Sequence, residues 1–540
     1  MEFERFAFPS RRSAVLAQNG MVATSQPLAA QAGLSVLQRG GNAIDAAIAT
    51  IAALCVVEPC STGIGGDAFA LIWSAKEQRL LGLNGSGPLG KTFSAESLRR
   101  QGYTNLPTHG GPSVTVPGSL RAWELALTRL GTLGLDTLLA PAIDYAARGF
   151  PVSPLIARQW AMSEALLRRQ SASRRVWLPG GRAPRAGEIF HNPEVAQTLR
   201  SLAADGYTAF YTGPIAEQIV ACVQADGGCL ILDDLATYRA EWVAPISLDY
   251  QAGAGGRYTF YEIPPNGQGL AALLALNLVQ GFDVRRWGWD SADYWHILIE
   301  AMKLAFADAH AYIADPRHTR IPLAGLLSPD YTQTRRALVS PLQAGLPAAG
   351  RPSQTGDTVY LSVADGQGNL VSWIQSLYMG FGSGLTAGTT GVQLQNRGAN
   401  FSLTPGHPNE AAPGKRPFHT IIPGFISRDD QPWCSFGVMG GFMQPQGHLQ
   451  VGLNLVEWGM EPQTALDAPR FNWVSDRTVA LETAGLPSEI AAALHQRGHQ
   501  VRTDLPGSFF GGGQVIVRDP DTGVLIGGSE PRKDGCVVGW

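Results

Sequence analysis

The sequence predicts a layered α/β fold in which the strands pair antiparallel. Helical apolar spacing dominates the chain up to about residue 313, and strand-like segments follow from residue 359 onward. Two of these segments, 359–364 and 370–377, are separated only by the turn-forming sequence Asp365-Gly-Gln-Gly-Asn369. Helices first, then strands, then a mixture of both is typical of stacked layers.

The expected helices begin at two alanine-rich segments near the N-terminus. Apolar residues recur at helical spacing over 29–38 and 43–56, and Gly40-Gly41-Asn42 separates the two segments. Asn42 is a good N-cap for the second helix, because its side chain accepts hydrogen bonds from the first free amides. The same spacing predicts helices over residues 117–128, 133–147, 193–204, 215–225, 291–313, 444–457 and 487–496.

The expected strands are short segments rich in β-branched, aromatic and other apolar residues. They cover residues 67–73, 80–83, 230–232, 258–263, 359–364, 370–377, 391–394, 420–427, 433–438 and 514–518. Residues 341–356 are rich in Pro, Gly, Ala, Ser and Gln and have no apolar period, so they are expected to form a surface linker. The chain shows no internal repeat, and its length predicts one large domain or two intertwined ones.

Composition excludes several classes of protein. The 540 residues are 45% hydrophobic and 16% charged, which excludes global disorder. The net charge of −3 with mixed signs predicts neither a nucleic acid nor a membrane partner. The most apolar segment, 43–57, contains Asp45 and is too short to cross a bilayer. Residues 1–13 have no apolar signal region, so we expect a cytoplasmic protein with six reduced, mostly buried cysteines.

Two motifs are typical of metal-binding and nucleotide-binding sites. His495 and His499 form an HxxxH pair, but Gly498 lies inside it and no glutamate adjoins it, so we expect a solvated helix end and no metal site. Residues 85–92 match the phosphate-binding pattern G-x-x-x-x-G-K-[ST], although Pro88 removes one amide from the loop. A P-loop nucleotide hydrolase therefore remains a remote alternative, and no cofactor is expected.

The most informative feature is the junction at Asp357-Thr358, where the polar linker ends abruptly at a strand. A threonine at a strand start is most often a packing residue. Here it belongs to a set of motifs that occur in order along the chain: Gly40-Gly-Asn-Ala-Ile-Asp45, Gly63-Ile-Gly-Gly-Asp67, Val116-Pro-Gly118, Asp234-Leu-Ala-Thr-Tyr238, Pro264-Pro-Asn-Gly-Gln-Gly269, Gly356-Asp-Thr358, Phe381-Gly-Ser-Gly384, Lys415-Arg-Pro417, Gly440-Gly441 and Asp467-Ala-Pro-Arg470. With these motifs the chain resembles the gamma-glutamyltranspeptidase family of N-terminal-nucleophile hydrolases over about residues 20–536.

The resemblance implies a four-layer αββα sandwich with two stacked antiparallel sheets, and a precursor that cuts itself before Thr358. Residues 1–357 would become a large subunit and residues 358–540 a small one, the two remaining intertwined in one domain. The new α-amine, with a reference pKa near ~8, would serve as general base for the hydroxyl of the same residue. The product is thus expected to be a heterodimer, and higher oligomers are left open.

Further site residues are implied by the same resemblance. Gly440 and Gly441 match the positions whose backbone amides stabilise the oxyanion, a contribution of about 3–4 kcal/mol per donor. Ser376 matches a second hydroxyl that contacts the nucleophile. With Thr358 these are the expected catalytic residues.

The substrate-binding positions depart from the family pattern. Asn84 stands where the family carries a carboxylate-binding arginine, and Asn400 where it carries an acid for the α-amino group. His419-Thr420 replace the paired serines that hold the carboxylate. An amide cannot replace a bidentate guanidinium, so a non-glutamyl acyl group is expected. Arg397 is then a candidate anchor for an anionic acyl chain or a salt-bridge residue, and Tyr378 and His419 either line the acyl pocket or pack in the core.

The functions that remain open fall into three classes. The favoured one is a self-processing amidohydrolase or acyltransferase that acts on a small-molecule amide, either oxamate-like or of the glutaryl-acylase type. A true gamma-glutamyltransferase or glutathione hydrolase is the closest alternative. The P-loop nucleotide hydrolase and an unprocessed binding protein complete the set.

Overall fold

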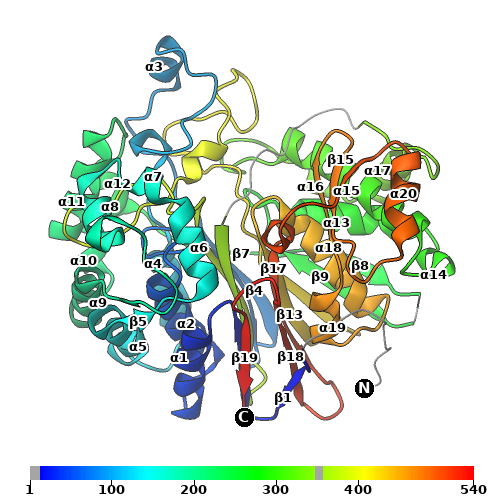
Figure 1. Cartoon of the computed structure of the whole chain (residues 1–540), viewed down its shortest axis with the longest axis horizontal. Helices are drawn as coiled ribbons and strands as arrows, with labels where there is room; N and C mark the ends of the chain where they lie inside the picture. The colour runs from blue at the N-terminus through cyan, green and yellow to red at the C-terminus, as the bar shows by residue number, and fades with distance from the viewer. Residues whose placement is uncertain (1–11, 254, 347–356) are drawn as a thin grey trace.

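Two seven-stranded antiparallel sheets lie face to face in the computed structural model, which describes residues 12–253, 255–346 and 357–540 (Figure 1). The first sheet has the order β1 (Val15–Ala17), β18 (Leu525–Ser529), β17 (Gly512–Arg518), β13 (Gln431–Met439), β12 (Gly424–Arg428), β9 (Arg257–Glu262), β8 (Ile246–Gln251). The second has the order β19 (Cys536–Gly539), β2 (Gly20–Thr24), β10 (Asp357–Asp365), β11 (Leu370–Tyr378), β3 (Asp67–Ser74), β4 (Arg79–Gly85), β7 (Glu241–Val243).

Helices cover both outer faces of this pair of sheets (Figure 1). One layer contains α1 (Pro27–Gln38), α2 (Ala43–Val57), α4 (Ser119–Leu130), α5 (Leu135–Arg148), α9 (Pro193–Asp205) and α11 (Pro214–Ala225). The other contains α13 (Gly269–Val279), α15 (Ala292–Tyr312), α18 (Met443–Val456) and α20 (Ser488–Gln496), beside a small sheet of β14 (Phe471–Ser475), β15 (Thr478–Leu481) and β16 (Gln500–Arg502). The expected αββα sandwich is therefore confirmed.

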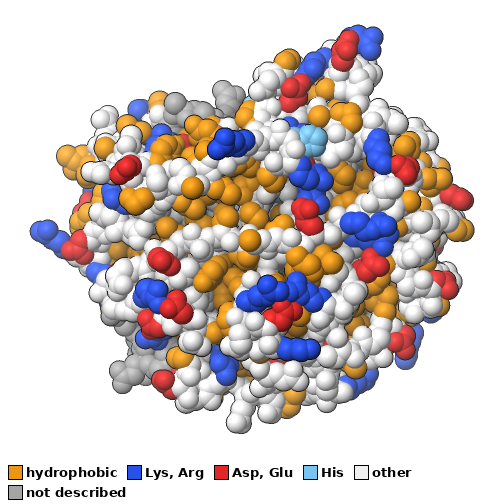
Figure 2. All heavy atoms as spheres, turned by 180° about the vertical axis from the view of Figure 1, so that it is seen from behind, with side chains coloured by type: hydrophobic (Ala, Val, Ile, Leu, Met, Phe, Trp, Pro, Cys, Tyr) orange, Lys and Arg blue, Asp and Glu red, His pale blue; other side chains and the backbone are white. Residues whose placement is uncertain are grey.

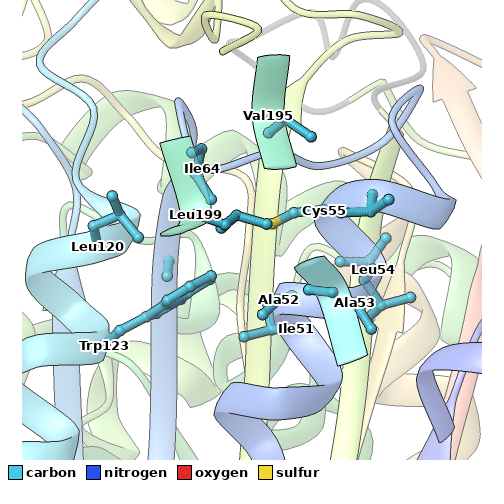
Figure 3. Close-up of a cluster of buried hydrophobic side chains, with 14 of the residues drawn as sticks. Ile51, Ala52, Ala53, Leu54, Cys55, Ile64, Leu120, Trp123, Val195 and Leu199 are labelled. Carbon is cyan, nitrogen blue, oxygen red and sulfur yellow. The ribbon is translucent and has the colours of Figure 1, made fainter. Parts of the chain in front are cut away.

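Apolar clusters between neighbouring layers hold the layers together. The cluster between the sheets includes Phe69 and Tyr360 from one sheet and Phe425 and Ile516 from the other. The helix α2 is buried along its whole length, and Figure 3 shows its Ile51 and Cys55 among side chains from α4 and α9. A helix with apolar residues all round must be buried in this way. Asn42 caps it as expected, accepting hydrogen bonds from the amides of Ile44 and Asp45.

Two expected strands are wrong, and part of the linker is not described. Residues 230–232 form no strand, because helix α12 (Leu232–Thr237) begins there and the Asp234 carboxylate accepts a hydrogen bond from the Ile231 amide. Residues 391–394 make only isolated bridges, Gly65 with Leu394 and Thr386 with Gln393. Residues 347–356 of the expected linker lie outside the described residues.

Candidate active site

Thr358 is the second residue of β10, the third strand of its sheet, and its side chain is 1% exposed. The register between β10 and β11 shifts here, because Asp357 lies opposite Tyr378 whereas Val359 lies opposite Gln375. The shift brings the Thr358 hydroxyl to Ser376, whose Oγ accepts its hydrogen bond at 3.3 Å. The amide of Tyr378 donates to the same Ser376 oxygen at 2.7 Å. The expected nucleophile and its expected second hydroxyl are thus in contact.

Gly440 and Gly441 form the turn between β13 and α18. Their φ angles are +123° and +60°, values that residues with side chains rarely adopt. The carbonyl of Gly440 accepts a hydrogen bond from the Met443 amide at 3.0 Å, which directs it toward the helix. Because the peptide unit is planar and trans, the amide N–H of Gly441 points the opposite way. That orientation frees one backbone donor from the helix, as an oxyanion site requires.

Arg397, His419 and Thr420 meet around one buried carboxylate, that of Asp67. His419 Nε2 lies 2.8 Å from Asp67 Oδ2, and Arg397 Nε lies 3.7 Å from the same oxygen. Arg397 also donates through Nη1 to Thr420 Oγ1 at 2.6 Å, and its guanidinium stacks on the Tyr378 ring at 4.5 Å. Arg397, His419 and Asp67 are all 0% exposed. The sequence interpretation missed Asp67 as a site residue, although it ends the motif Gly63-Ile-Gly-Gly-Asp67.

Burial dominates the titration of this cluster. It raises the pKa of Asp67 to about 7, against the opposing effect of Arg397. It lowers the pKa of Arg397 to about 10, and it lowers that of His419 well below its ordinary value. His419 is therefore a neutral imidazole that donates through Nε2 to the carboxylate, and Arg397 keeps its charge at neutral pH.

Gln268 ties this cluster to the glycine turn. Its side-chain Nε2 donates to the carbonyl of Thr420 at 2.5 Å and to that of Gly441 at 2.9 Å. Asn84 is linked less directly: its side chain donates to Asn266 Oδ1 at 3.0 Å, and the carbonyl of Asn266 accepts from the His419 amide. Asn84 is 2% exposed and its oxygen accepts from the Ser86 amide, so both of its polar atoms bond to protein.

Tyr378 and Asn400 are the expected site residues that line a cavity of about 410 Å³. Asn400 accepts a hydrogen bond from Asn409 through its backbone carbonyl, while its Nδ2 is buried without a partner. One wall is aromatic, formed by His310, Phe418 and Phe442, and it was not anticipated from the sequence. Tyr378 contacts both the cavity and Arg397, so the guanidinium lies one side chain behind the cavity wall.

The phosphate-loop alternative does not fit the geometry of residues 85–92. The amides of Ser86, Leu89 and Lys91 donate to Asn84, to the carbonyl of Lys415 and to Asp234, respectively. The Lys91 ammonium pairs with Asp233. These donors therefore bind protein acceptors and do not converge on a phosphate site.

His499 is not a solvated residue, and the expectation for the HxxxH pair is wrong in this respect. It is 1% exposed, and its Nε2 lies 2.9 Å from Nδ1 of His296 on α15. Together with Glu300, these two histidines form a group of three possible metal ligands among the described residues. Their ligand atoms all lie within 4.8 Å of one another. Lys303 already donates to Glu300 at 2.7 Å, and His296 Nε2 bonds the Ser340 carbonyl at 2.8 Å. These contacts tie α15 to the segment that precedes residue 347.

The surface and the cysteines are consistent with the composition. Basic and acidic side chains are interspersed over the face shown in Figure 2. Among the described helices, none combines the length and apolar character needed to cross a membrane. All six cysteines are free thiols, three of them buried, namely Cys55, Cys60 and Cys434.

The four-layer fold is that of the N-terminal-nucleophile hydrolases. The model of the family described as gamma-glutamyltranspeptidase matches residues 29–540, so the chain belongs to the gamma-glutamyltranspeptidase family and is an enzyme of that family. It is 38% identical to the glutathione hydrolase-like YwrD proenzyme of Bacillus subtilis, over 97% of this chain and 99% of that one. It is 35% identical to the oxamate amidohydrolase proenzyme of Klebsiella pneumoniae, over 98% and 100%.

A solved structure gives the same assignment. The cephalosporin acylase from Bacillus halodurans superposes with a TM-score of 0.93 at 49% identity, covering 100% of this chain and 99% of that one. Relatives with amidohydrolase, acylase and glutathione hydrolase names thus share nearly the full length of this chain.

Proposed function

We propose that the protein is a self-processing amidohydrolase or acyltransferase whose nucleophile is Thr358. Cleavage of the Asp357-Thr358 bond gives a large subunit, 1–357, and a small subunit, 358–540. The observation that carries the proposal is the contact between the Thr358 and Ser376 hydroxyls at the start of a strand held on both sides by β2 and β11. The proenzyme names of the relatives support it.

Processing is an acyl shift that needs no cofactor. The Thr358 Oγ attacks the carbonyl carbon of Asp357, the C–N bond breaks, and the nitrogen leaves as the α-amine of Thr358. Water then opens the resulting ester, which releases the Asp357 carboxylate and restores the hydroxyl. Ser376 orients the attacking oxygen through the 3.3 Å hydrogen bond.

Turnover repeats the same chemistry on a small amide. The α-amine takes the hydroxyl proton as the oxygen attacks the substrate carbonyl, and it returns the proton to the leaving amine. The oxyanion is stabilised by the amides of the Gly440-Gly441 turn. The acyl ester on Thr358 is then transferred to water or to an acceptor amine.

The acyl group we propose is anionic and not a glutamyl zwitterion. Arg397 is fully buried, with the Asp67 carboxylate 3.7 Å from its Nε, and its Nε and Nη2 have no hydrogen-bond partner. A buried guanidinium with open donors is suited to a carboxylate. The 0% exposed Thr420 hydroxyl beside it supplies a further polar contact. Asn400, without charge, replaces an acid that would hold an α-amino group.

A panel of amides of increasing chain length tests this proposal. Oxamate, succinamate, glutaramate and glutaryl anilide are compared with gamma-glutamyl anilide and glutathione, and ammonia or amine release is measured on the processed enzyme. We expect at least one anionic non-glutamyl amide to exceed the gamma-glutamyl donors in kcat/KM by about tenfold or more. A preference for the gamma-glutamyl donors would replace the proposal with a glutathione hydrolase, which the names of several relatives favour.

The remaining expectations stay predictions. We expect a cytoplasmic enzyme with a small-molecule amide as its partner, and assembly beyond the processed heterodimer is left to measurement. Size-exclusion chromatography with light scattering on the processed protein gives the oligomeric state directly.

A further inference from the structure

Asp67 is a buried acid in the middle of a proposed anion site, which needs explanation. Asp67 is the residue opposite Ser376 in the β3–β11 pair, and Ser376 contacts Thr358. Asp67 is 0% exposed and accepts hydrogen bonds from His419 Nε2 at 2.8 Å and from Gln395 Nε2 at 3.0 Å. A negative charge at this position opposes the binding of a second one.

The contact between Asp67 and Arg397 is electrostatic and not a hydrogen bond. The separation of 3.7 Å between Arg397 Nε and Asp67 Oδ2 exceeds hydrogen-bonding distance. Arg397 therefore has a counter-ion while two of its nitrogen atoms, Nε and Nη2, keep their hydrogen-bonding capacity. Leaving buried donors unsatisfied is costly unless a ligand uses them.

We propose that Asp67 is the resident counter-ion of Arg397, and that the carboxylate of the substrate's acyl group takes over this role when it binds. Asp67 is then a specificity-determining residue, because it balances the buried guanidinium in the empty site and competes with the incoming anion. The inference rests on the proposed function, since it assumes that Arg397 binds the acyl carboxylate.

The exchange requires Asp67 to lose its charge when the anion binds. Two anions beside one guanidinium in a buried site repel each other, and uptake of one proton by Asp67 removes the repulsion. Burial already raises the pKa of this carboxyl to about 7, so protonation is accessible near neutral pH. Of the other titratable groups facing Asp67, His419 and Tyr238 are neutral because burial shifts their pKa values away from ionisation. The Arg397 and Arg416 guanidinium groups favour the charged form of the Asp67 carboxyl and so oppose its protonation.

The substitution Asp67→Asn tests the exchange, because it mimics the protonated carboxyl. Oxalate, the product anion of an oxalyl donor, is used as a competitive inhibitor of the processed enzyme from pH 6 to pH 9. In the unsubstituted protein we expect the inhibition constant to rise above pH 7 by up to about tenfold per pH unit, as one linked proton requires. In Asp67→Asn we expect a lower inhibition constant for oxalate at pH 8–9. We also expect the part of its pH dependence that is caused by protonation of Asp67 to disappear. Titration of the Thr358 amine is common to both proteins and cancels in the comparison.

Glu262→Gln is the matched control. Glu262 is another buried carboxylate beside a histidine, with His448 Nδ1 at 2.6 Å, and it is not bonded to the site residues described above. We expect its oxalate profile to match that of the unsubstituted protein. Parallel profiles for Asp67→Asn and the unsubstituted, active enzyme would overturn the inference and leave the proposed function standing.

A second measurement avoids dependence on the folding of a variant. Calorimetric titration of the unsubstituted enzyme with oxalate at pH 8, in two buffers of different ionisation enthalpy, gives the number of protons taken up. We expect a value near one from Asp67. Binding without proton uptake would refute the exchange, whereas absence of both processing and amide hydrolysis would refute the proposed function itself.

Discussion

The Thr358 hydroxyl donates a 3.3 Å hydrogen bond to the Ser376 hydroxyl, and both side chains are buried between neighbouring strands. The two residues are 18 positions apart and are brought together by the short turn between β10 and β11 and by the register shift at Thr358. The geometry around the proposed nucleophile is therefore set by local strand pairing.

Removal of the Thr358 hydroxyl should abolish both cleavage and activity. We expect Thr358→Ala to yield one full-length chain on a denaturing gel, because no other group on this residue can attack the Asp357 carbonyl. Thr358→Ser keeps the hydroxyl and should yield two bands more slowly. Two bands from the alanine variant would contradict the assignment of the nucleophile.

Ser376 should affect the rate of processing more than the fold. Loss of one neutral hydrogen bond is worth about 1 kcal/mol, so we expect Ser376→Ala to slow processing about fivefold. Ser376→Thr keeps a hydroxyl at the same position and serves as the control. The time course of band conversion gives both rates, and equal rates for the alanine and unsubstituted proteins would exclude the proposed role.

Gly440→Ala should lower kcat through the oxyanion turn. The added Cβ would make a tight 3.1 Å contact with the Gly511 Cα, and the φ of +123° strains any residue that has a side chain. Gly406→Ala is the control, since Gly406 also has a positive φ, +77°, but a Cβ there meets no atom within 4 Å. We expect a kcat loss of at least about tenfold in the first variant and little change in the second. Similar kcat values would place the oxyanion donors elsewhere.

Arg397 should act on substrate affinity. A hydrogen bond to a charged group contributes about 1.5–3 kcal/mol, so Arg397→Met is expected to raise KM for an anionic amide by roughly ten- to a hundredfold. An uncharged amide hydrolysed by the same enzyme provides the reference, and its KM should change little. An equal change for both substrates would mean that Arg397 only supports the fold.

Acid should destabilise the protein through His499. Burial and nearby cations lower its pKa to about 3, whereas an unfolded histidine titrates near ~6.5. The unfolded chain therefore binds a proton that the folded protein does not, and stability falls as the pH drops from 6.5 toward 3. We expect His499→Gln to flatten the decline of Tm over this range. His495→Gln, at an exposed position, should leave the decline unchanged.

The sequence predicted those parts of the fold that depend on local pattern. The long helices α2 and α15 and the β10–β11 pair were predicted within one or two residues, because apolar period and turn chemistry are local properties. The short edge strands β1 and β19 were missed because their partners, β18 and β2, lie at the opposite end of the chain. The segment 230–232 was assigned to a strand because a short apolar segment does not distinguish a strand from a helix start.

For the site as well, the sequence pointed to residues whose signal was in the motifs and missed residues that depend on distant contacts. Thr358 and the glycine pair came from ordered motifs and Ser376 from the family resemblance, and the structure places Thr358 and Ser376 in contact. Asp67 was missed as a partner of His419 because 352 positions separate the two residues, and His419 lies on the irregular segment that precedes β12. The aromatic wall at His310 was missed for the same reason, since its neighbours come from distant loops.

The strand order of the second sheet affects how the two subunits are held together after cleavage. From one edge to the other, the proposed small subunit supplies β19, then β10 and β11, while the large subunit supplies β2 between them and β3, β4 and β7 beyond. The strands of the two products would thus alternate in one hydrogen-bonded sheet, and neither product alone would contain a complete hydrophobic core. If the cleaved subunits unfold and separate, they must re-form this strand order without the covalent link that was present when the precursor first folded. We therefore expect the cleaved protein to refold much less readily than the precursor.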